Sequence, residues 1–152
     1  MGKYSNDMLK KFDGSWPREL LGLVCGDYLG GGMTREVYRF APDEDFVIKF
    51  EPNEGHFQNV AEWQLWERIA ETKFAKWFAP CHRISHCGRI LIARYAEPLA
   101  AINLPAEVPA FFTDLKPGNW GSYKKHPVAL DYGKHLMLER GMTGRMRKAD
   151  WT

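Results

Sequence analysis

Two short stretches constrain the fold of this 152-residue chain more than any other part of its sequence. In Phe111–Asn119, charged and polar side chains follow two adjacent aromatic residues, and in Val128–Gly133 a short apolar run ends in a carboxylate. The residues between them follow the pattern strand, turn, strand, with the turn at Lys124–Pro127. A β-hairpin here would bring Asp131, which follows its second strand, back to the neighbourhood of Asn119, which precedes its first.

The polar side chains of these stretches suit a divalent cation with a proton acceptor beside it. Asn119 and Asp131 both offer oxygen atoms, the ligands that Mg²⁺ prefers in proteins. Asp114 and Lys116 lie two positions apart, so in an extended loop their side chains point the same way. Asp114 could accept a proton from an attacking hydroxyl group. We therefore expect these four residues to form one site.

The order of these residues resembles that of a known family. Asp-Leu-Lys-Pro-Gly-Asn, beginning at Asp114, and the later Leu-Asp-Tyr-Gly around Asp131 are similar to the catalytic loop and the metal-binding triplet of the protein kinase superfamily. The resemblance implies that Asp114 is the catalytic base and that Lys116 steadies the γ-phosphate. It also implies that Asn119 and Asp131 are the Mg²⁺ ligands.

A cluster of three glycines lies in the N-terminal half of the chain. Gly30–Gly32 would let backbone amides approach a phosphate closely, although a plain hairpin turn has the same composition. Followed by Val37, the cluster resembles the kinase glycine-rich loop between the first two strands. Arg35 stands where that loop usually has its third glycine, and it could either contact a phosphate or block it.

Lys49 lies inside the apolar run Phe46–Phe50, which has the composition of a β-strand. A lysine in such a run either extends to solvent from an edge strand or lies in a cleft with an acidic or phosphate partner. We favour the cleft. In that position Lys49 resembles the third-strand lysine of kinases, which contacts the α- and β-phosphates.

Residues 57–72 have the periodicity of a helix whose apolar stripe carries Leu65, Trp66 and Ile69. Glu62 lies on that stripe, where an unpaired carboxylate would be costly. We therefore predict that Glu62 pairs with Lys49, as in the lysine–glutamate pair of kinases. Glu67, which lies off the stripe, is the alternative partner if the register of the helix differs.

The short run Arg94, Tyr95 and Ala96 follows a predicted buried strand at Ile90–Ala93. It resembles the kinase hinge, whose backbone binds the edge of adenine, and an ordinary strand end is the alternative. The resemblance thus implies a set of nucleotide-binding residues drawn from the glycine loop, the strands and the hinge. They are Gly30, Gly31, Gly32, Val37, Val47, Lys49, Arg94, Tyr95 and Ala96.

Cysteine and histidine residues cluster at 81–87. In a strand, Cys81 and Cys87 would share one face while His82 and His86 face the other way, so four ligands could not converge on zinc. We expect a fourth strand of the sheet here instead. Three cysteines, an odd number, favour a reducing cytoplasm, and no apolar run has the length of a membrane span. The N-terminus lacks the apolar core of a secretion signal.

The resemblance implies an α+β fold: a protein kinase-like N-lobe, with an antiparallel sheet and one main helix, and a strongly truncated C-lobe. Three prolines between Tyr95 and Asp114 exclude a long helix there. We divide the chain into an N-terminal extension at 1–19, a reduced kinase-like domain at 20–133 and a basic C-terminal tail at 134–152. Such a reduced form resembles the small kinase-like proteins of bacteriophages.

The resemblance implies a minimal ATP-dependent phosphotransferase that uses ATP and Mg²⁺ and transfers the γ-phosphate to a hydroxyl group, on a protein substrate. The first alternative is a weak or inactive kinase-like protein that inhibits or recruits a partner, and the second is a small-molecule kinase. A net charge of +2 gives no argument for nucleic-acid binding. The tail is expected to be a solvated basic end or a docking surface for an acidic partner, and an exposed apolar face would favour homo-oligomers.

Overall fold

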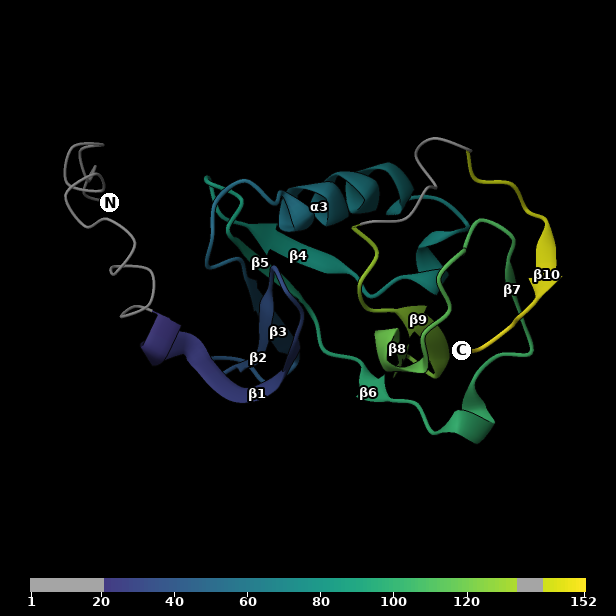
Figure 1. Ribbon diagram of the computed structural model, residues 1–152, viewed down its shortest axis with the longest axis horizontal. Helices are drawn as coiled ribbons and strands as arrows, with labels where there is room; N and C mark the ends of the chain where they lie inside the picture. Colours follow the sequence, from purple (N-terminus) through teal and green to yellow (C-terminus); the bar gives the residue numbers. More distant parts are fainter. Residues whose placement is uncertain (1–20, 134–140) are drawn as a thin grey trace.

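The computed structural model describes residues 21–133 and 141–152. They form an α+β protein in which antiparallel sheets dominate and α3 (Gln58–Ile69) is the main helix (Figure 1). No helix in these two ranges is long and apolar enough to cross a membrane. The helices predicted near residues 5–12 and from Leu136 onward lie outside the described residues.

One sheet of five strands forms the N-terminal half. Its strands are β1 (Cys25–Gly31), β2 (Glu36–Phe40), β3 (Phe46–Phe50), β4 (Cys81–Ile84) and β5 (Ile90–Arg94). Their order across the sheet is β1-β2-β3-β5-β4, and every neighbouring pair is antiparallel. β3 therefore lies in the middle, and all five of its residues are buried.

The sequence predicted most of this sheet. The strands at Phe46–Phe50 and at the start of the 81–87 cluster are confirmed. The strand-like run predicted from Leu20 is wrong for residues 21–24, which are helical, and β1 begins only at Cys25. Leu21, in this helical turn, packs with Ile48 and Phe50 in a small core cluster.

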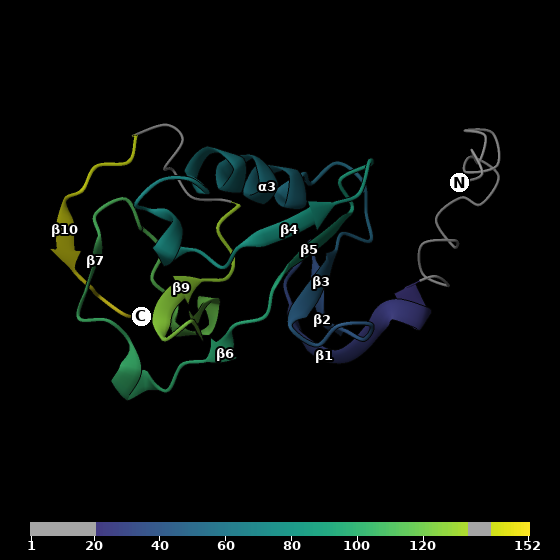
Figure 2. The same ribbon diagram turned by 180° about the vertical axis from the view of Figure 1, so that it is seen from behind.

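Helix α3 covers one face of the sheet, against β4 and β5 (Figures 1 and 2). It is shorter than the predicted 57–72. Phe57 has a left-handed φ of 55° and stands outside the helix, and the Thr72 hydroxyl donates to the Ile69 carbonyl at 2.7 Å just beyond its end. Its buried side carries Glu62, Leu65 and Ile69, as the periodicity predicted.

A second, three-stranded sheet follows the first. It consists of β6 (Glu97–Pro98), β8 (Trp120–Tyr123) and β9 (His126–Ala129), with β8 in the middle. The predicted β8–β9 hairpin is confirmed, although its turn is only Lys124 and Lys125, with φ values of 51° and 64°. Beyond the strands, the Leu130 amide donates to the Asn119 carbonyl at 2.8 Å, so the two motifs are adjacent.

The described C-terminal residues pack against the rest of the fold. β10 (Met146–Lys148) pairs with β7 (Glu107–Pro109), and the Arg147 guanidinium donates to the Phe112 carbonyl at 2.7 Å. The Thr152 amide donates to the Leu115 carbonyl at 3.1 Å. The expectation of a solvated basic end therefore holds for the exposed Arg145 and Lys148 and is wrong for the backbone of this segment.

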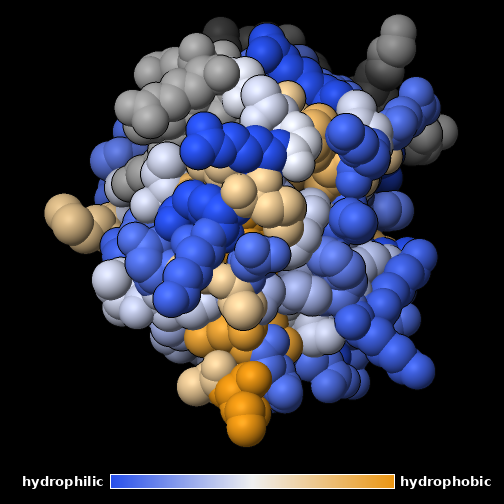
Figure 3. Space-filling view, turned by 90° about the vertical axis from the view of Figure 1, so that its right-hand side faces the viewer, coloured by the Kyte–Doolittle hydropathy of each residue, from blue (hydrophilic) through white to orange (hydrophobic). Residues whose placement is uncertain are grey.

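Three single-turn 3₁₀ helices complete the described fold: η1 (Ala75–Trp77), η2 (Ala101–Asn103) and η3 (Pro117–Asn119). The main core joins α3 to the second sheet and to the loop before η3. Its buried residues are Leu65, Ile69, Phe78, Cys81, Leu91, Val108, Phe111, Phe112, Leu115, Trp120, Ala129 and Tyr132. Seen from the side of β10, the surface is largely hydrophilic (Figure 3).

Trp151 is expected to hold the C-terminal segment on this core. Its indole donates to the Pro105 carbonyl at 3.0 Å, and its ring lies edge-on to Trp120 at 5.4 Å between centroids. Because the side chain is only partly buried, Trp151→Ala should lower the free energy of unfolding by about 2–3 kcal/mol in urea titrations. Ile102→Ala, which changes an exposed side chain, is the control and should cost less than about 0.5 kcal/mol. Equal effects would contradict this role of Trp151.

Candidate functional site

A buried ion pair lies between the first sheet and helix α3. The Lys49 Nζ atom, from β3, is 2.8 Å from Oε2 of Glu62, from the second turn of α3. Glu62 is fully buried and the Lys49 side chain is 6% exposed. Lys49 and Glu62 therefore pair as the sequence predicted, whereas Glu67 is exposed.

Arg35 joins this pair, which the sequence analysis did not predict. Its guanidinium lies 3.1 and 3.3 Å from the two carboxylate oxygens of Glu62 and donates to Asn59 Oδ1 at 3.0 Å. Its Nη2 atom lies 2.9 Å from Asp131 Oδ1. The available signal was an arginine at the end of a glycine loop, but only the loop's conformation determines which acids it reaches.

Asp131 and its neighbours dock on the same cluster. Gln58 Nε2 donates to Asp131 Oδ1 at 2.9 Å, and the Tyr132 amide donates to Glu62 Oε1 at 3.0 Å. The Lys49 ammonium donates to the Leu130 carbonyl. The predicted metal-binding segment is thus anchored directly to the predicted lysine–glutamate pair.

The electrostatics of the cluster keep Glu62 ionised. Burial alone raises the pKa of Glu62, but the attraction of Lys49 and Arg35, with their hydrogen bonds, outweighs burial and lowers it to about 2. Burial opposes the charge of Arg35, yet Glu62 and Asp131 raise its pKa above the ordinary value. Two cations and two carboxylates therefore neutralise one another in this cluster.

The N-terminus of α3 is held by a side chain from the end of β3. Glu51 is buried and accepts the amides of Gln58 at 2.8 Å and Asn59 at 3.4 Å, which satisfies two of the free amides of the helix. The side-chain Nδ2 of Asn59 donates to the backbone carbonyl of Lys49 at 3.1 Å. These contacts fix the helix relative to β3 and hence fix the ion pair.

The glycine loop is closed down on α3. The Gly32 amide donates to the Arg35 carbonyl at 2.9 Å, and a side chain at Gly31 would come within 2.9 Å of that same carbonyl. Thr34 Oγ1 donates to Gln58 Oε1 at 2.5 Å, while Met33 at the tip is fully exposed. The Gly32 amide that was expected to face a phosphate is therefore engaged within the loop.

Asp114 and Lys116 lie on the surface, before η3. Their Oδ2 and Nζ atoms are 3.3 Å apart and both side chains are more than half exposed. The buried Leu115 between them fixes the loop, and the Asn119 amide donates to the Lys116 carbonyl at 2.9 Å. An exposed pair of this kind adds little stability. Because both side chains are exposed, both charged groups are accessible to a ligand.

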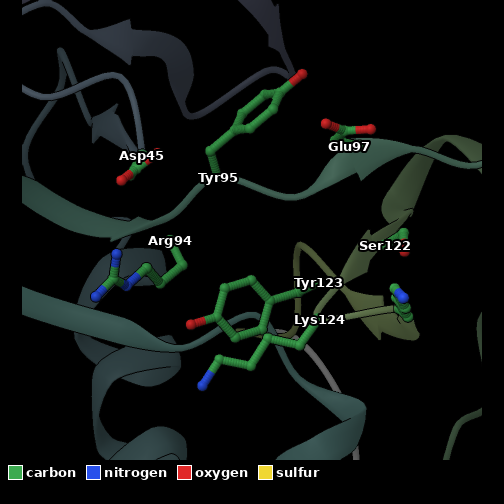
Figure 4. A pocket seen from close by; sticks show the side chains of 8 residues that line it. Asp45, Arg94, Tyr95, Glu97, Ser122, Tyr123 and Lys124 are labelled. Carbon is green, nitrogen blue, oxygen red and sulfur yellow. The ribbon is translucent and has the colours of Figure 1, made fainter.

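A cavity of about 460 Å³ lies beside the predicted hinge (Figure 4). Its walls come from the end of β5, the start of β6 and the β8–β9 turn, and none of the ion-cluster residues lines it. Its lining residues are Asp45, Arg94, Tyr95, Glu97, Ser122, Tyr123, Lys124 and Lys125. The Tyr95 amide already donates to the Asp45 carbonyl at 2.8 Å, so this hinge amide is engaged.

The other predicted nucleotide-binding residues lie on the sheet near the cluster. Val37 pairs with Lys49 across β2 and β3, and the buried Val47 pairs with Ala93. Ala96 is buried and packs with Val128.

Within residues 21–133 and 141–152, no group of three or more His, Cys, Asp or Glu side chains has metal-binding geometry. Cys81 is buried with its sulfur 3.2 Å from the Tyr132 hydroxyl, whereas Cys87 is exposed. Burial is the main cause that raises the pKa of Cys81 to about 12, so its thiol stays protonated. The predicted Mg²⁺ ligands, Asn119 and Asp131, are an amide and a single carboxylate.

The described residues thus define an α+β protein in which the buried Arg35, Lys49 and Glu62 form an ion cluster with the partly exposed Asp131. No family model, curated protein or solved structure matches the chain. Function is therefore inferred from the geometry of the site itself.

Proposed function

We propose that the chain is an ATP-dependent phosphotransferase that transfers the γ-phosphate to a hydroxyl group. The observation that carries this proposal is the buried Lys49–Glu62 pair, whose atoms lie 2.8 Å apart beside the Asp131 segment. A buried lysine held by a helix glutamate and facing a carboxylate loop is what phosphoryl transfer needs to orient a triphosphate.

The fold supports the finer proposal of a reduced protein kinase-like architecture. The five-stranded sheet with α3 corresponds to an N-lobe, and the β6–β9 sheet with the loop at Phe111–Asn119 corresponds to a truncated C-lobe. The described residues between Tyr95 and Asp114 contain only β6, β7 and the single turn η2, which is consistent with the proline argument.

Each candidate residue then has a role in the proposed reaction. Lys49 contacts the α- and β-phosphates, Asp114 accepts the proton of the substrate hydroxyl, and Lys116 steadies the γ-phosphate. Asn119 and Asp131 would hold Mg²⁺, which would neutralise charge on the phosphates. Both supply the oxygen ligands that Mg²⁺ prefers, and Asp131 is partly exposed.

The test is transfer of label from γ-labelled ATP in the presence of Mg²⁺. We expect label on the protein or on a substrate in a cell lysate, with the signal reduced at least about a hundredfold in Lys49→Met and Asp114→Asn. Glu71→Gln, an exposed change just beyond the end of α3, is the control and should keep the wild-type rate. Full activity in both site variants, or no effect of nucleotide on the melting temperature of the wild-type protein, would contradict the proposal.

A second candidate function is a nucleotide-bound or empty kinase-like protein that binds a partner. One observation favours it: Arg35 lies 2.9 Å from Asp131, where a metal ion would need that carboxylate. A wild-type protein that binds ATP and transfers no phosphate would support this second function over the first.

A further inference from the structure

The contact between Arg35 and Asp131 has consequences for how the site is loaded. We propose that Arg35 is a built-in latch: its guanidinium occupies the place of a divalent cation beside Asp131, and the glycine loop must release it before Mg²⁺ and nucleotide bind. This inference rests on the proposed function, because it concerns the regulation of the same site.

Arg35 is buried and needs hydrogen-bond acceptors from other elements. It is 4% exposed although it comes from a loop whose tip residue, Met33, is fully exposed. A buried arginine needs acceptors for its donors, and here the acceptors come from two elements far apart in sequence. Glu62 and Asn59 belong to α3, and Asp131 belongs to the loop after β9.

Arg35 and a divalent cation compete for Asp131. Arg35 and Gln58 both donate to the same oxygen, Oδ1, each at 2.9 Å. A divalent cation on this carboxylate would lie close to the guanidinium, and like charges at such a distance repel strongly in a partly buried site. A metal ion and the latched Arg35 therefore exclude each other.

The phosphate side of the site leads to the same conclusion. With Arg35 latched, Glu62 shares its charge between two cations, and the Gly32 amide is turned to the Arg35 carbonyl. Opening the loop would free that amide and Asp131 together. The contact between Thr34 and Gln58 would break in the same movement, because it ties the same loop to α3.

Arg35→Gln tests the latch, because it removes the cation and leaves a neutral, shorter polar side chain in its place. If the closed loop dominates in the free protein, the apparent affinity for a ligand is reduced by the fraction of open molecules. We expect Arg35→Gln to bind Mn²⁺ about tenfold more tightly than the wild-type protein does. The binding is measured from the paramagnetic effect of Mn²⁺ on water relaxation. The affinity of the variant for Mg²⁺–ATP, measured by calorimetry, should rise by a similar factor.

The two readouts separate the latch from the proposed function. Tighter Mn²⁺ binding with no ATP binding in any variant would keep the latch and overturn the phosphotransferase. ATP binding that is equal or weaker in Arg35→Gln, with unchanged Mn²⁺ affinity, would overturn the latch and keep the phosphotransferase. Should Arg35→Gln fail to fold, Arg35→Lys keeps a second cation beside Glu62 in addition to Lys49, and it is expected to show the same change with a smaller factor.

Discussion

Glu62→Gln is expected to lower the free energy of unfolding by about 3–5 kcal/mol, the largest stability effect of any single substitution in this site. Glutamine preserves the size of the side chain and removes its charge. Lys49 and Arg35, both buried, would then lack the carboxylate that lies 2.8 and 3.1 Å from them. Chemical denaturation at pH 7 with circular dichroism measures the effect.

Glu67→Gln is the matched control on the same helix. Glu67 is exposed and lies one turn and a half further along α3, so its change should cost less than about 0.5 kcal/mol. Similar losses in the two variants would show that Glu62 is an ordinary helix residue, and the site argument would fail.

Glu62→Gln should also alter the dependence of stability on pH. The pKa of Glu62 is about 2 in the folded chain against an ordinary value of 4.5, and a folded pKa below the unfolded one contributes stability at higher pH. This contribution, about 3 kcal/mol, is complete above pH 4.5 and is lost as the pH falls toward 2. Glu62→Gln should therefore flatten the stability curve in that window, and an unchanged slope would contradict the pKa.

Asp131→Asn is expected to reduce phosphate transfer by about a hundredfold to a thousandfold while leaving the fold intact. The change removes the negative charge of the proposed metal ligand. The asparagine carbonyl can still accept hydrogen bonds from Arg35 and Gln58, and the side chain is only partly buried. The cost in stability should therefore be about 1 kcal/mol. Initial rates with γ-labelled ATP, measured over a range of Mg²⁺ concentrations, provide the readout.

Asp150→Asn is the control for loss of a carboxylate elsewhere. Asp150 is exposed, pairs with Arg147 at 2.6 Å and makes none of the contacts of the ion cluster. This variant should keep the wild-type rate. An Asp131→Asn protein that works within threefold of wild type at all Mg²⁺ concentrations would show that Asp131 is not the metal ligand.

Local patterns were sufficient for the parts of the site that lie on regular elements. The 3.6-residue period placed Glu62 on the buried side of α3, and the cost of burying an unpaired charge then selected Lys49 as its partner. The β8–β9 hairpin could likewise be predicted, because two strand-like runs flank a polar turn. Its exact bounds differ, since β9 begins at His126 rather than at Val128.

The contacts made by irregular segments could not be predicted in the same way. Arg35 and Asp131 are 96 positions apart, and no periodicity relates a loop to a loop. The segment at 141–152 is another example: it has no strand-like apolar run, yet β10 pairs with β7 and Thr152 supports the loop at Leu115. Its pairing depends on a partner strand that only the folded chain presents.

The sequence by itself determined that Lys49 and Glu62 would pair and which strand and helix carry them, because periodicity and burial costs act over a few neighbouring residues. Only the tertiary structure decided that Arg35 closes on Asp131 and that the chain end supports the Asp114 loop. Both contacts depend on the packing of segments that lie far apart in the sequence, and local sequence patterns do not predict the free energy of that packing.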